Sequence, residues 1–198
     1  SVPPNLRRLN DVAFSGDGEP TTYKNFDEIV ELCAELKSKH ELDETKMVLI
    51  TNASMFHRQP VKRGLEVLDQ NQGEVWAKLE AGTEEYFKIV DRTPIPFQQI
   101  LDNITSASKI RPLVIQSLFM RIDTAPPSGE ELGQYCERLN EIQSAGGQIK
   151  LVQIYTIARR PTESYVHMLE DSEVDQIVDL VRQSTGLETI AFYGSSDY

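Results

Sequence analysis

The sequence predicts an α/β fold in which short parallel strands alternate with helices to form a partial, TIM-like (βα) barrel. Short apolar runs bounded by turn residues alternate with longer segments of helical periodicity, the pattern of repeated βα units. Several runs are apolar on both faces, as in strands covered by helices. The chain has 198 residues, of which 39% are hydrophobic, so we expect one domain, 1–198, with one core.

Six apolar runs are the expected strands of this sheet. They span residues 12–14, 47–51, 75–79, 113–120, 151–157 and 190–193. They make five to six βα units, fewer than the eight of a closed barrel. The first run begins near residue 11, with little sequence ahead of it to cover that edge of the sheet. We therefore expect a partial barrel whose first unit is missing.

Helices are expected between these strands, and three have clear end signals. Asn25 with Glu28, and Ser128 with Glu131, have the spacing of a capping box. A third helix is expected to begin at Ser172. The glycines at 146 and 186 end the second and third helices. Weaker helical patterns lie at 61–68 and 97–104, the latter after two prolines that suit helix entry.

Charge and hydropathy restrict the function classes. With 20 Lys and Arg against 31 Asp and Glu, the formal net charge is -11, which favours solubility and repels nucleic acid over most of the surface. The N-terminal residues lack the apolar stretch of a signal peptide, and no long apolar run suggests a membrane span. We expect a cytoplasmic protein without membrane association.

Metal-ligating residue types are scattered along the chain. Cys33 and Cys136 both fall on the apolar stripe of an expected helix, which favours structural burial. The three histidines have no second ligand at a metal-binding spacing. Local sequence spacing therefore predicts no metal site.

The loop directly after the first strand is the most informative segment. Residues 15–21 read SGDGEPT, and ligands of barrels and open α/β sheets bind at the carboxyl ends of strands. Its two glycines permit positive φ angles and the close approach of a ligand to the backbone. On spacing alone, a tight strand-to-helix turn explains them as well.

The tetrad 17–20, Asp-Gly-Glu-Pro, resembles the "GGEP" motif of radical S-adenosylmethionine (SAM) enzymes. That motif ends the second barrel strand in the superfamily and binds the amino group of SAM, so the resemblance places Gly18, Glu19 and Pro20 at the methionine end of the cofactor. Asp17 replaces the commoner Gly. The longer run SGDGEPT is similar to a subgroup that contains the wyosine-type tRNA-modifying enzymes and related iron–sulfur oxidoreductases.

Later strand ends agree with this resemblance. Thr51 and Asn52 end the second run as "TN", a position that faces the cofactor in the family, and 78–82 reads KLEAG where relatives have KLDAG. Strand alternation places Lys78 and Glu80 on the same side, which we expect to be the barrel interior, as an ion pair. Both are candidate cofactor-binding residues.

Polar residues on the fifth and sixth units have two explanations. Gln116 with Ser117, and Gln153 with Tyr155, lie on runs that otherwise suit a core, and buried polar groups need partners. Either they bind a cofactor or they form hydrogen bonds with one another. The first alternative makes Gln116 a further candidate cofactor-binding residue. Residues 159–161, Arg-Arg-Pro, either face a substrate or form a solvated loop.

The resemblance implies SAM and a [4Fe–4S] cluster as cofactors, with reductive cleavage of SAM to a 5′-deoxyadenosyl radical that abstracts hydrogen from a substrate. It also implies a reductant such as flavodoxin or ferredoxin. The cluster-binding Cys-x-x-x-Cys-x-x-Cys motif precedes the "GGEP" strand in the family and is absent here. We therefore expect a C-terminal fragment of such an enzyme that is inactive by itself and binds neither cofactor. A modified tRNA base is a possible substrate that the acidic composition does not support.

Two other functions remain open. Lys78 at a strand end is also suited to a Schiff-base lyase or aldolase, with Glu80 tuning the amine. A degenerate barrel that acts as a non-enzymatic binding module would lack the cysteine motif natively.

Overall fold

The computed structural model describes residues 3, 8–16 and 18–194. Asp17 of the Asp-Gly-Glu-Pro tetrad lies outside these residues. Six strands form one sheet in the order β1-β2-β3-β4-β6-β8, and two short strands, β5 and β7, form a second, antiparallel one. The strands of the larger sheet are Asp11–Phe14 (β1), Lys46–Thr51 (β2), Gly73–Lys78 (β3), Leu113–Leu118 (β4), Ile149–Tyr155 (β6) and Thr189–Phe192 (β8). The α/β class and the open sheet agree with the prediction.

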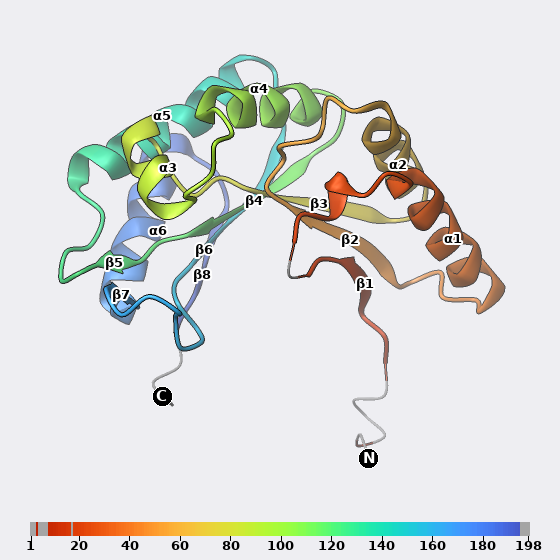
Figure 1. The fold of residues 1–198 in the computed structure, drawn as a ribbon, viewed down its shortest axis with the longest axis horizontal. Helices are drawn as coiled ribbons and strands as arrows, with labels where there is room; N and C mark the ends of the chain where they lie inside the picture. Colours follow the sequence, from red (N-terminus) through yellow and green to blue (C-terminus); the bar gives the residue numbers. More distant parts are fainter. Residues whose placement is uncertain (1–2, 4–7, 17, 195–198) are drawn as a thin grey trace. The chain divides into compact units, whose positions relative to one another are not determined.

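Helices follow the strands in the expected alternation (Figure 1). They are the short 3-10 helix η2 (Pro20–Thr22) and the α-helices α1 (Phe26–Lys39), α2 (Gln59–Gln70), α3 (Glu84–Val90), α4 (Phe97–Ser108), α5 (Gly129–Ser144) and α6 (Asp171–Thr185). The sequence patterns did not predict η2, α3, or the pair β5 (Arg121–Ile122) and β7 (Val166–His167). All are too short for helical or strand periodicity to emerge.

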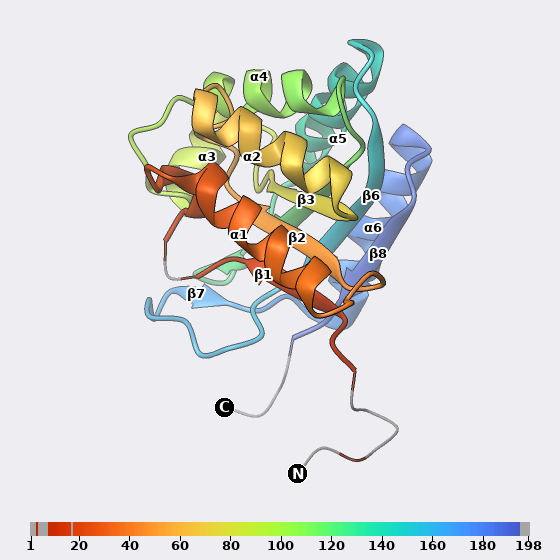
Figure 2. The same ribbon diagram turned by 90° about the vertical axis from the view of Figure 1, so that its right-hand side faces the viewer.

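Backbone contacts divide the chain into two compact units, Ser1–Trp76 and Ala77–Tyr198. In the first unit, β1 pairs with β2 in parallel. Helix α1 lies beside α2 on one face of these strands (Figure 2). Met47 and Leu49 of β2 are completely buried, as are Val61 and Leu68 of α2. This core fixes the ends of β1 and β2, where the loop that contains Glu19 begins.

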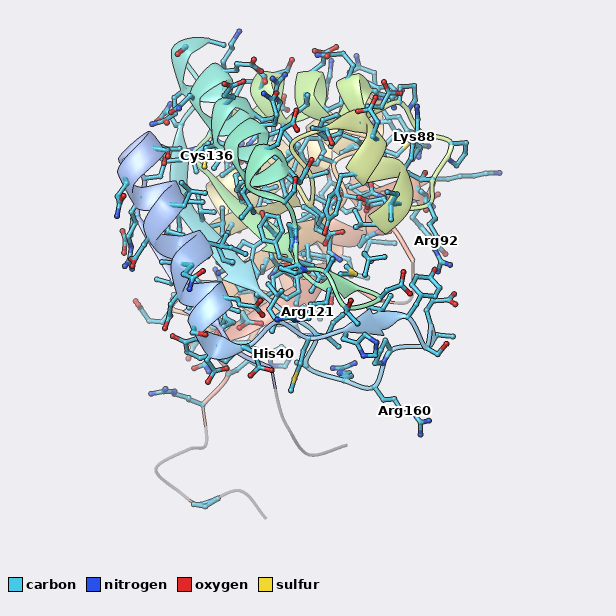
Figure 3. All side chains as sticks on the ribbon, turned by 90° about the vertical axis from the view of Figure 1, so that its left-hand side faces the viewer. His40, Lys88, Arg92, Arg121, Cys136 and Arg160 are labelled. Carbon is cyan, nitrogen blue, oxygen red and sulfur yellow. The ribbon has the colours of Figure 1, made fainter. Side chains whose placement is uncertain are left out.

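In the second unit, β6 pairs in parallel with β4 on one side and β8 on the other. Helices α4, α5 and α6 pack in chain order, and α5 and α6 lie side by side in Figure 3. The core includes the edge-to-face pair Phe119 and Tyr135, with ring centroids 5.2 Å apart. None of the helices in the described part of the chain is long and apolar enough to cross a membrane.

The first two predicted helix starts are at the observed positions, but the predicted reciprocal capping bonds do not form. Asn25 is the N-cap of α1, but it makes no capping bond, and its amide donates to Glu28 Oε2 at 3.0 Å. Its φ of -105° and ψ of 42° differ from the extended backbone that a capping side chain requires. Ser128 does cap α5, accepting from the Glu131 backbone N–H at 3.1 Å. Its expected partner, the Glu131 side chain, instead accepts hydrogen bonds from the loop after β3.

The third helix begins one residue before its predicted start at Ser172. Helix α6 begins at Asp171, with Glu170 as its N-cap. Glu170 and Glu173 form a reciprocal capping box, which satisfies the first backbone donors that Ser172 was expected to satisfy. Gly186 ends the helix in the left-handed conformation, as predicted.

Candidate functional site

The Glu19 carboxylate ties the loop after β1 to the end of β2. Its Oε1 accepts hydrogen bonds from the Thr21 backbone N–H at 3.0 Å, the Thr21 hydroxyl at 2.5 Å and the Thr51 hydroxyl at 2.6 Å. Its Oε2 accepts from the Asn52 backbone N–H at 2.7 Å. The structure thus brings together Glu19, Thr51 and Asn52, three of the predicted site residues. We call this arrangement the Glu19 clasp.

The four donors of the clasp are unevenly divided between the two Glu19 carboxylate oxygens. Oε1 accepts three of these hydrogen bonds and Oε2 accepts one, so Oε2 keeps acceptor capacity for a ligand. Pro20 opens η2 directly after Glu19 and fixes the chain direction there. Arg58 strengthens the same turn from the start of α2, donating to the carbonyls of Thr21 and Thr22 at 3.0 and 3.1 Å. Arg58 was not predicted, because its partners are backbone atoms that have no sequence signature.

The two glycines of this loop, Gly16 and Gly18, were expected to allow either positive φ angles or the close approach of a ligand. Only Gly146 and Gly186 among the described glycines have positive φ angles, so Gly16 and Gly18 are not needed to turn the chain. A Cβ atom at Gly16 or Gly18 would meet none of the described protein atoms within 4 Å. A side chain at either position would therefore face open space, which leaves room for a ligand to approach the backbone of this loop.

A cavity of about 310 Å³ lies next to this loop, between β1 and α1. Besides the loop residues Ser15, Gly18, Glu19 and Pro20, its lining is mostly apolar: Ala13, Phe14, Tyr23, Phe26 and Ile29. The Phe14 and Phe26 rings meet edge to face, with centroids 6.3 Å apart. The lining suits apolar side chains better than the charged methionine end of SAM.

A second polar cluster lies within the second unit, at the end of β3. Lys78 Nζ is 3.8 Å from Glu80 Oε1, so the predicted ion pair forms, with side chains 38% and 10% exposed. Tyr155, the last residue of β6, donates to Glu80 Oε1 at 3.2 Å. Asp91, which caps the C-terminus of α3, shares a hydrogen bond with Glu80. We call these four residues, Lys78, Glu80, Asp91 and Tyr155, the Glu80 cluster.

Burial and charge perturb the acids of the Glu80 cluster. Burial raises the pKa of Glu80, although the Lys78 ammonium opposes the shift. Burial, followed by repulsion from the Glu80 carboxylate, raises the pKa of Asp91 to about 7. The two carboxyl groups therefore hold a shared proton over much of the physiological pH range. Asp91 Oδ2 is buried and has no hydrogen-bond partner among the described residues.

Two tyrosines respond to the same charges. Burial, with the nearby Glu131 and Glu80 carboxylates, raises the pKa of Tyr86 to about 12. Burial and Glu80 likewise raise the pKa of Tyr155. The buried Tyr86 hydroxyl has no hydrogen-bond partner within the described part of the chain. Asp91 and Tyr86 belong to α3, a helix that the sequence patterns missed, and so neither was predicted.

The other polar residues of the strands bond mainly to one another. Gln116 Nε2 donates to Gln153 Oε1 at 3.1 Å, and the Ser117 and Tyr135 hydroxyls are 2.6 Å apart. Of the two explanations for these residues, mutual hydrogen bonding is therefore found. The Gln116 backbone lies next to the segment that contains Glu80, because its carbonyl accepts a hydrogen bond from the Leu79 N–H at 3.2 Å.

The Arg159–Arg160 loop is exposed, and in Figure 3 the Arg160 side chain points away from the ribbon. Arg92, by contrast, pairs with Glu163 at 2.8 Å, and Arg121 of β5 pairs with Glu173 of α6 at 2.6 Å. The first of these ion pairs ties the segment between β6 and α6 to the segment just after α3, and the second ties β5 to α6. The solvated-loop explanation therefore fits Arg159 and Arg160.

The fit of an iron–sulfur cluster was tested on the available donors. Both cysteines are free thiols, Cys33 partly buried on α1 and Cys136 buried on α5. Burial raises the pKa of each thiol, which disfavours the thiolate that iron binds. Within residues 8–16 and 18–194, no three His, Cys, Asp or Glu side chains gather where they could hold a metal ion. These residues do not fit a cluster, and no chemical step is derived through one.

Comparison with known proteins finds relatives both in structure and in sequence. A solved structure, a radical SAM methyltransferase from Sphaerobacter thermophilus, superposes with a TM-score of 0.63 and 13% identity, covering 94% of this chain and 52% of that chain. At this identity the match shows the fold alone. The chain therefore has the α/β fold found in a radical SAM methyltransferase.

A curated protein named GTPase Obg, from Brachyspira hyodysenteriae, is 24% identical over 174 residues, which are 87% of this chain and 23% of that protein. No family model matches. The chain thus spans about half the length of its structural relative and about a quarter of its sequence relative.

Proposed function

We propose that this chain is the C-terminal part of a radical SAM enzyme, and that its loop 15–18 binds the methionine end of SAM through backbone atoms. The observation that carries the proposal is the Glu19 clasp, which holds a glycine-containing strand-end loop in place while the second carboxylate oxygen, Oε2, still has acceptor capacity. The shared fold with a radical SAM methyltransferase supports it.

Each group at the two strand ends then has a distinct role. Thr51 and Asn52 position the loop by donating to Glu19 and do not themselves have to contact the cofactor. The carbonyl groups of the loop would accept from the SAM amino group, since an ammonium is a donor without acceptor capacity. Within the second unit, the Glu80 cluster would present Lys78 and a carboxyl group to the hydroxyl or carboxylate groups of a ligand.

SAM, together with a reduced iron–sulfur cluster, supplies the radical chemistry in such enzymes. Because the described residues do not fit a cluster, its cysteines would come from a part of the enzyme outside residues 1–198. We propose a flavodoxin or ferredoxin as the reductant, and a substrate from which a hydrogen atom is abstracted. The GTPase activity in the name of the sequence relative is not proposed here, since the chain contains no G-x-x-x-x-G-K-[ST] loop.

The experiment is performed on the natural polypeptide with all of its coding sequence. After anaerobic reconstitution with iron and sulfide and reduction with dithionite, the protein is incubated with SAM, and 5′-deoxyadenosine is measured by liquid chromatography. Release of 5′-deoxyadenosine is the expected result. A polypeptide that takes up no cluster would remove the proposal.

The surroundings of Lys78 also allow the lyase alternative to be tested. Lys78 is partly exposed and lies beside two carboxyl groups, an acid–base environment that Schiff-base chemistry uses. The Lys78 ammonium, however, lies 3.8 Å from Glu80 Oε1, and a carbonyl compound would have to displace this ion pair to reach the amine. Reduction with borohydride in the presence of a carbonyl compound should therefore leave Lys78 unmodified.

A further inference from the structure

Glu131 is a charged residue that is buried inside the second unit. It lies in the first turn of α5, where a glutamate can stay in solvent and bond back to the start of the helix. The residue is instead only 5% exposed, and both of its carboxylate oxygens have partners outside α5. Oε1 accepts from the Gly82 backbone N–H, and Oε2 accepts from the Thr83 hydroxyl. Because a buried carboxylate needs such partners, this contact fixes the loop after β3 on α5.

Backbone packing shows how closely this loop approaches α5. A Cβ atom at Gly82 would lie 2.6 Å from the Gln134 carbonyl carbon and 2.7 Å from the Glu131 carbonyl oxygen. Glycine, which has no Cβ atom, allows the two backbones to come this close. The preceding residue, Ala81, is completely buried. The loop is therefore held on α5 by backbone contact as well as by the Glu131 carboxylate.

Thr83 connects this contact to helix α3. Its hydroxyl donates to Glu131 and accepts from the Tyr86 backbone N–H at 3.2 Å, which makes Thr83 the N-cap of α3. A seven-residue helix is not stable by itself, so its direction depends on its cap and on tertiary packing. Part of that packing is the contact between the Phe87 and Phe97 rings, whose centroids lie 5.0 Å apart. Glu131 therefore holds the start of α3 through one threonine.

The other end of α3 returns to the residue at which the loop began. Asp91 is the C-cap of α3, and its carboxyl group shares a hydrogen bond with Glu80. The segment 80–91 thus forms a closed turn. Its two ends meet where the Glu80 and Asp91 carboxyl groups touch, and the Glu131 carboxylate anchors it in between. The position of Asp91 relative to Glu80 therefore depends on a residue that belongs to a different helix.

Electrostatics make the contact between the two carboxyl groups dependent on this anchor. The groups that face Asp91 from the neighbouring strand ends are Glu80, Lys78 and Tyr155. Two carboxyl groups repel each other when both are ionised, so they stay in contact only where the surrounding structure holds them together. If the anchor is released, α3 can move away from Glu80, and water then reaches both carboxyl groups.

We propose that Glu131 is a positioning residue for the Glu80 cluster. It anchors the loop after β3 and the N-cap of α3 on α5, and in this way it sets the distance between the Glu80 and Asp91 carboxyl groups. A ligand that binds at Lys78 then meets two carboxyl groups whose arrangement is fixed in advance. The inference rests on the proposed function only in assigning the cluster to a ligand, because the two carboxyl groups are in contact without one.

A pH titration of the Asp91 carboxyl carbon by ¹³C NMR tests the proposal. The natural polypeptide is labelled with aspartate that carries ¹³C at the side-chain carboxyl, no SAM is added, and Asp91→Asn identifies the signal. Glu131→Gln presents an amide donor to a loop donor, whereas Thr83→Val removes the link to α3 without changing a charge. Burial and Glu80 raise the pKa of Asp91 to about 7 in the parent protein. We expect both variants to lower this pKa by at least about 1.

Two further variants separate positioning from a general loss of structure. Thr83→Ser keeps the hydroxyl that bonds to Glu131 and Tyr86, so the pKa of Asp91 should stay within about 0.3 of the parent value. Asp27→Asn removes a buried carboxylate that anchors α1 on α2 in the first unit, and it should leave the pKa of Asp91 unchanged. A parent-like pKa in both Glu131→Gln and Thr83→Val would overturn the proposal. A lowered pKa in Glu131→Gln alone would overturn it as well, because Glu131 would then act through its charge. The titration needs no cofactor, so its result is independent of whether the protein cleaves SAM.

Discussion

Two glutamates follow strands of the same sheet, and their surroundings make them different groups. Glu19 is surrounded by neutral hydrogen-bond donors from Thr21, Thr51 and Asn52, which bond to both of its oxygens. Glu80 has a lysine at 3.8 Å, a tyrosine hydroxyl and a second carboxyl group, Asp91. The first arrangement holds a loop in place, whereas the second raises the pKa of two neighbouring carboxyl groups. Position at a strand end therefore does not by itself define the role of a carboxylate.

The comparison predicts that Glu19 contributes most to stability. Glu19→Gln replaces one acceptor oxygen with a donor that faces other donors, so we expect a loss of about 2–4 kcal/mol in the free energy of unfolding. Urea titration followed by circular dichroism measures it. The matched control is Glu28→Gln, which alters an exposed carboxylate that accepts only from Asn25. Equal stability of the two variants would refute the structural role of the clasp.

A smaller effect is expected from the clasp's threonine. The Thr51 hydroxyl donates to Glu19 and accepts from the Ala53 N–H at 3.0 Å. Thr51→Val removes both hydrogen bonds and therefore weakens the clasp. We expect a loss of about 1–3 kcal/mol in the same titration. Thr22→Val, which removes an exposed hydroxyl that bonds to the Glu19 carbonyl, should cost less. The reverse order would mean that the loop is held by its backbone alone.

The Glu80 cluster should respond to pH in a way that the clasp does not. Burial and the neighbouring Glu80 raise the pKa of Asp91 from its ordinary 3.8 to about 7, so between these values the folded state binds more protons than the unfolded state. Its stabilising contribution is complete below pH 3.8 and is lost as the pH rises through about 7. Asp91→Asn removes this dependence and should raise stability by about 1–2 kcal/mol at pH 8.

Thermal unfolding of the Asp91→Asn variant from pH 5 to pH 8 measures this difference. Asp102→Asn on the exposed face of α4 is the control, because Asp102 bonds only to Gln98 within its own helix. A parent protein and an Asp91→Asn variant with the same pH profile would show that no proton is stored at Glu80 and Asp91.

Lys78 should have the smallest effect on stability. It is partly exposed and 3.8 Å from Glu80, so Lys78→Gln is expected to change the free energy of unfolding by less than about 1 kcal/mol. Removing the ammonium also takes away the attraction that opposes the raised pKa of Glu80. A loss of several kcal/mol would mean that Lys78 is a buried structural partner instead of a group available to a ligand.

The strands and their order of alternation with helices could be predicted because each long element carries its own periodicity. The run 47–51 falls within β2, the run 113–120 contains β4, and Gly186 ends α6 as its position indicated. A resemblance named Glu19, Thr51 and Asn52 together as candidate cofactor-binding residues, and the structure shows that they bond to one another. Their bonds to one another depend on the register of β1 against β2, which single-strand patterns do not specify.

What the sequence could not predict comes from contacts between distant segments. Asp91 and Tyr86 lie on α3, a seven-residue helix with too few turns to show an amphipathic stripe. Glu131 had the spacing of a capping residue, yet its side chain accepts from the Gly82 N–H and the Thr83 hydroxyl, 49 and 48 residues away. A buried donor competes with a local cap for the same carboxylate, and sequence spacing reveals only the local partner.

The most direct test of the central claim is the affinity for SAM of a Gly18→Ala variant of the natural, cluster-loaded polypeptide, measured alongside its thermal unfolding. Because a Cβ at Gly18 would meet none of the described protein atoms and the backbone there has no positive φ, the substitution should leave the Tm unchanged. If SAM lies against this loop, affinity should fall by at least about tenfold, or 1.4 kcal/mol. Unchanged affinity at unchanged Tm would contradict the claim that the Glu19 clasp holds a SAM-binding loop.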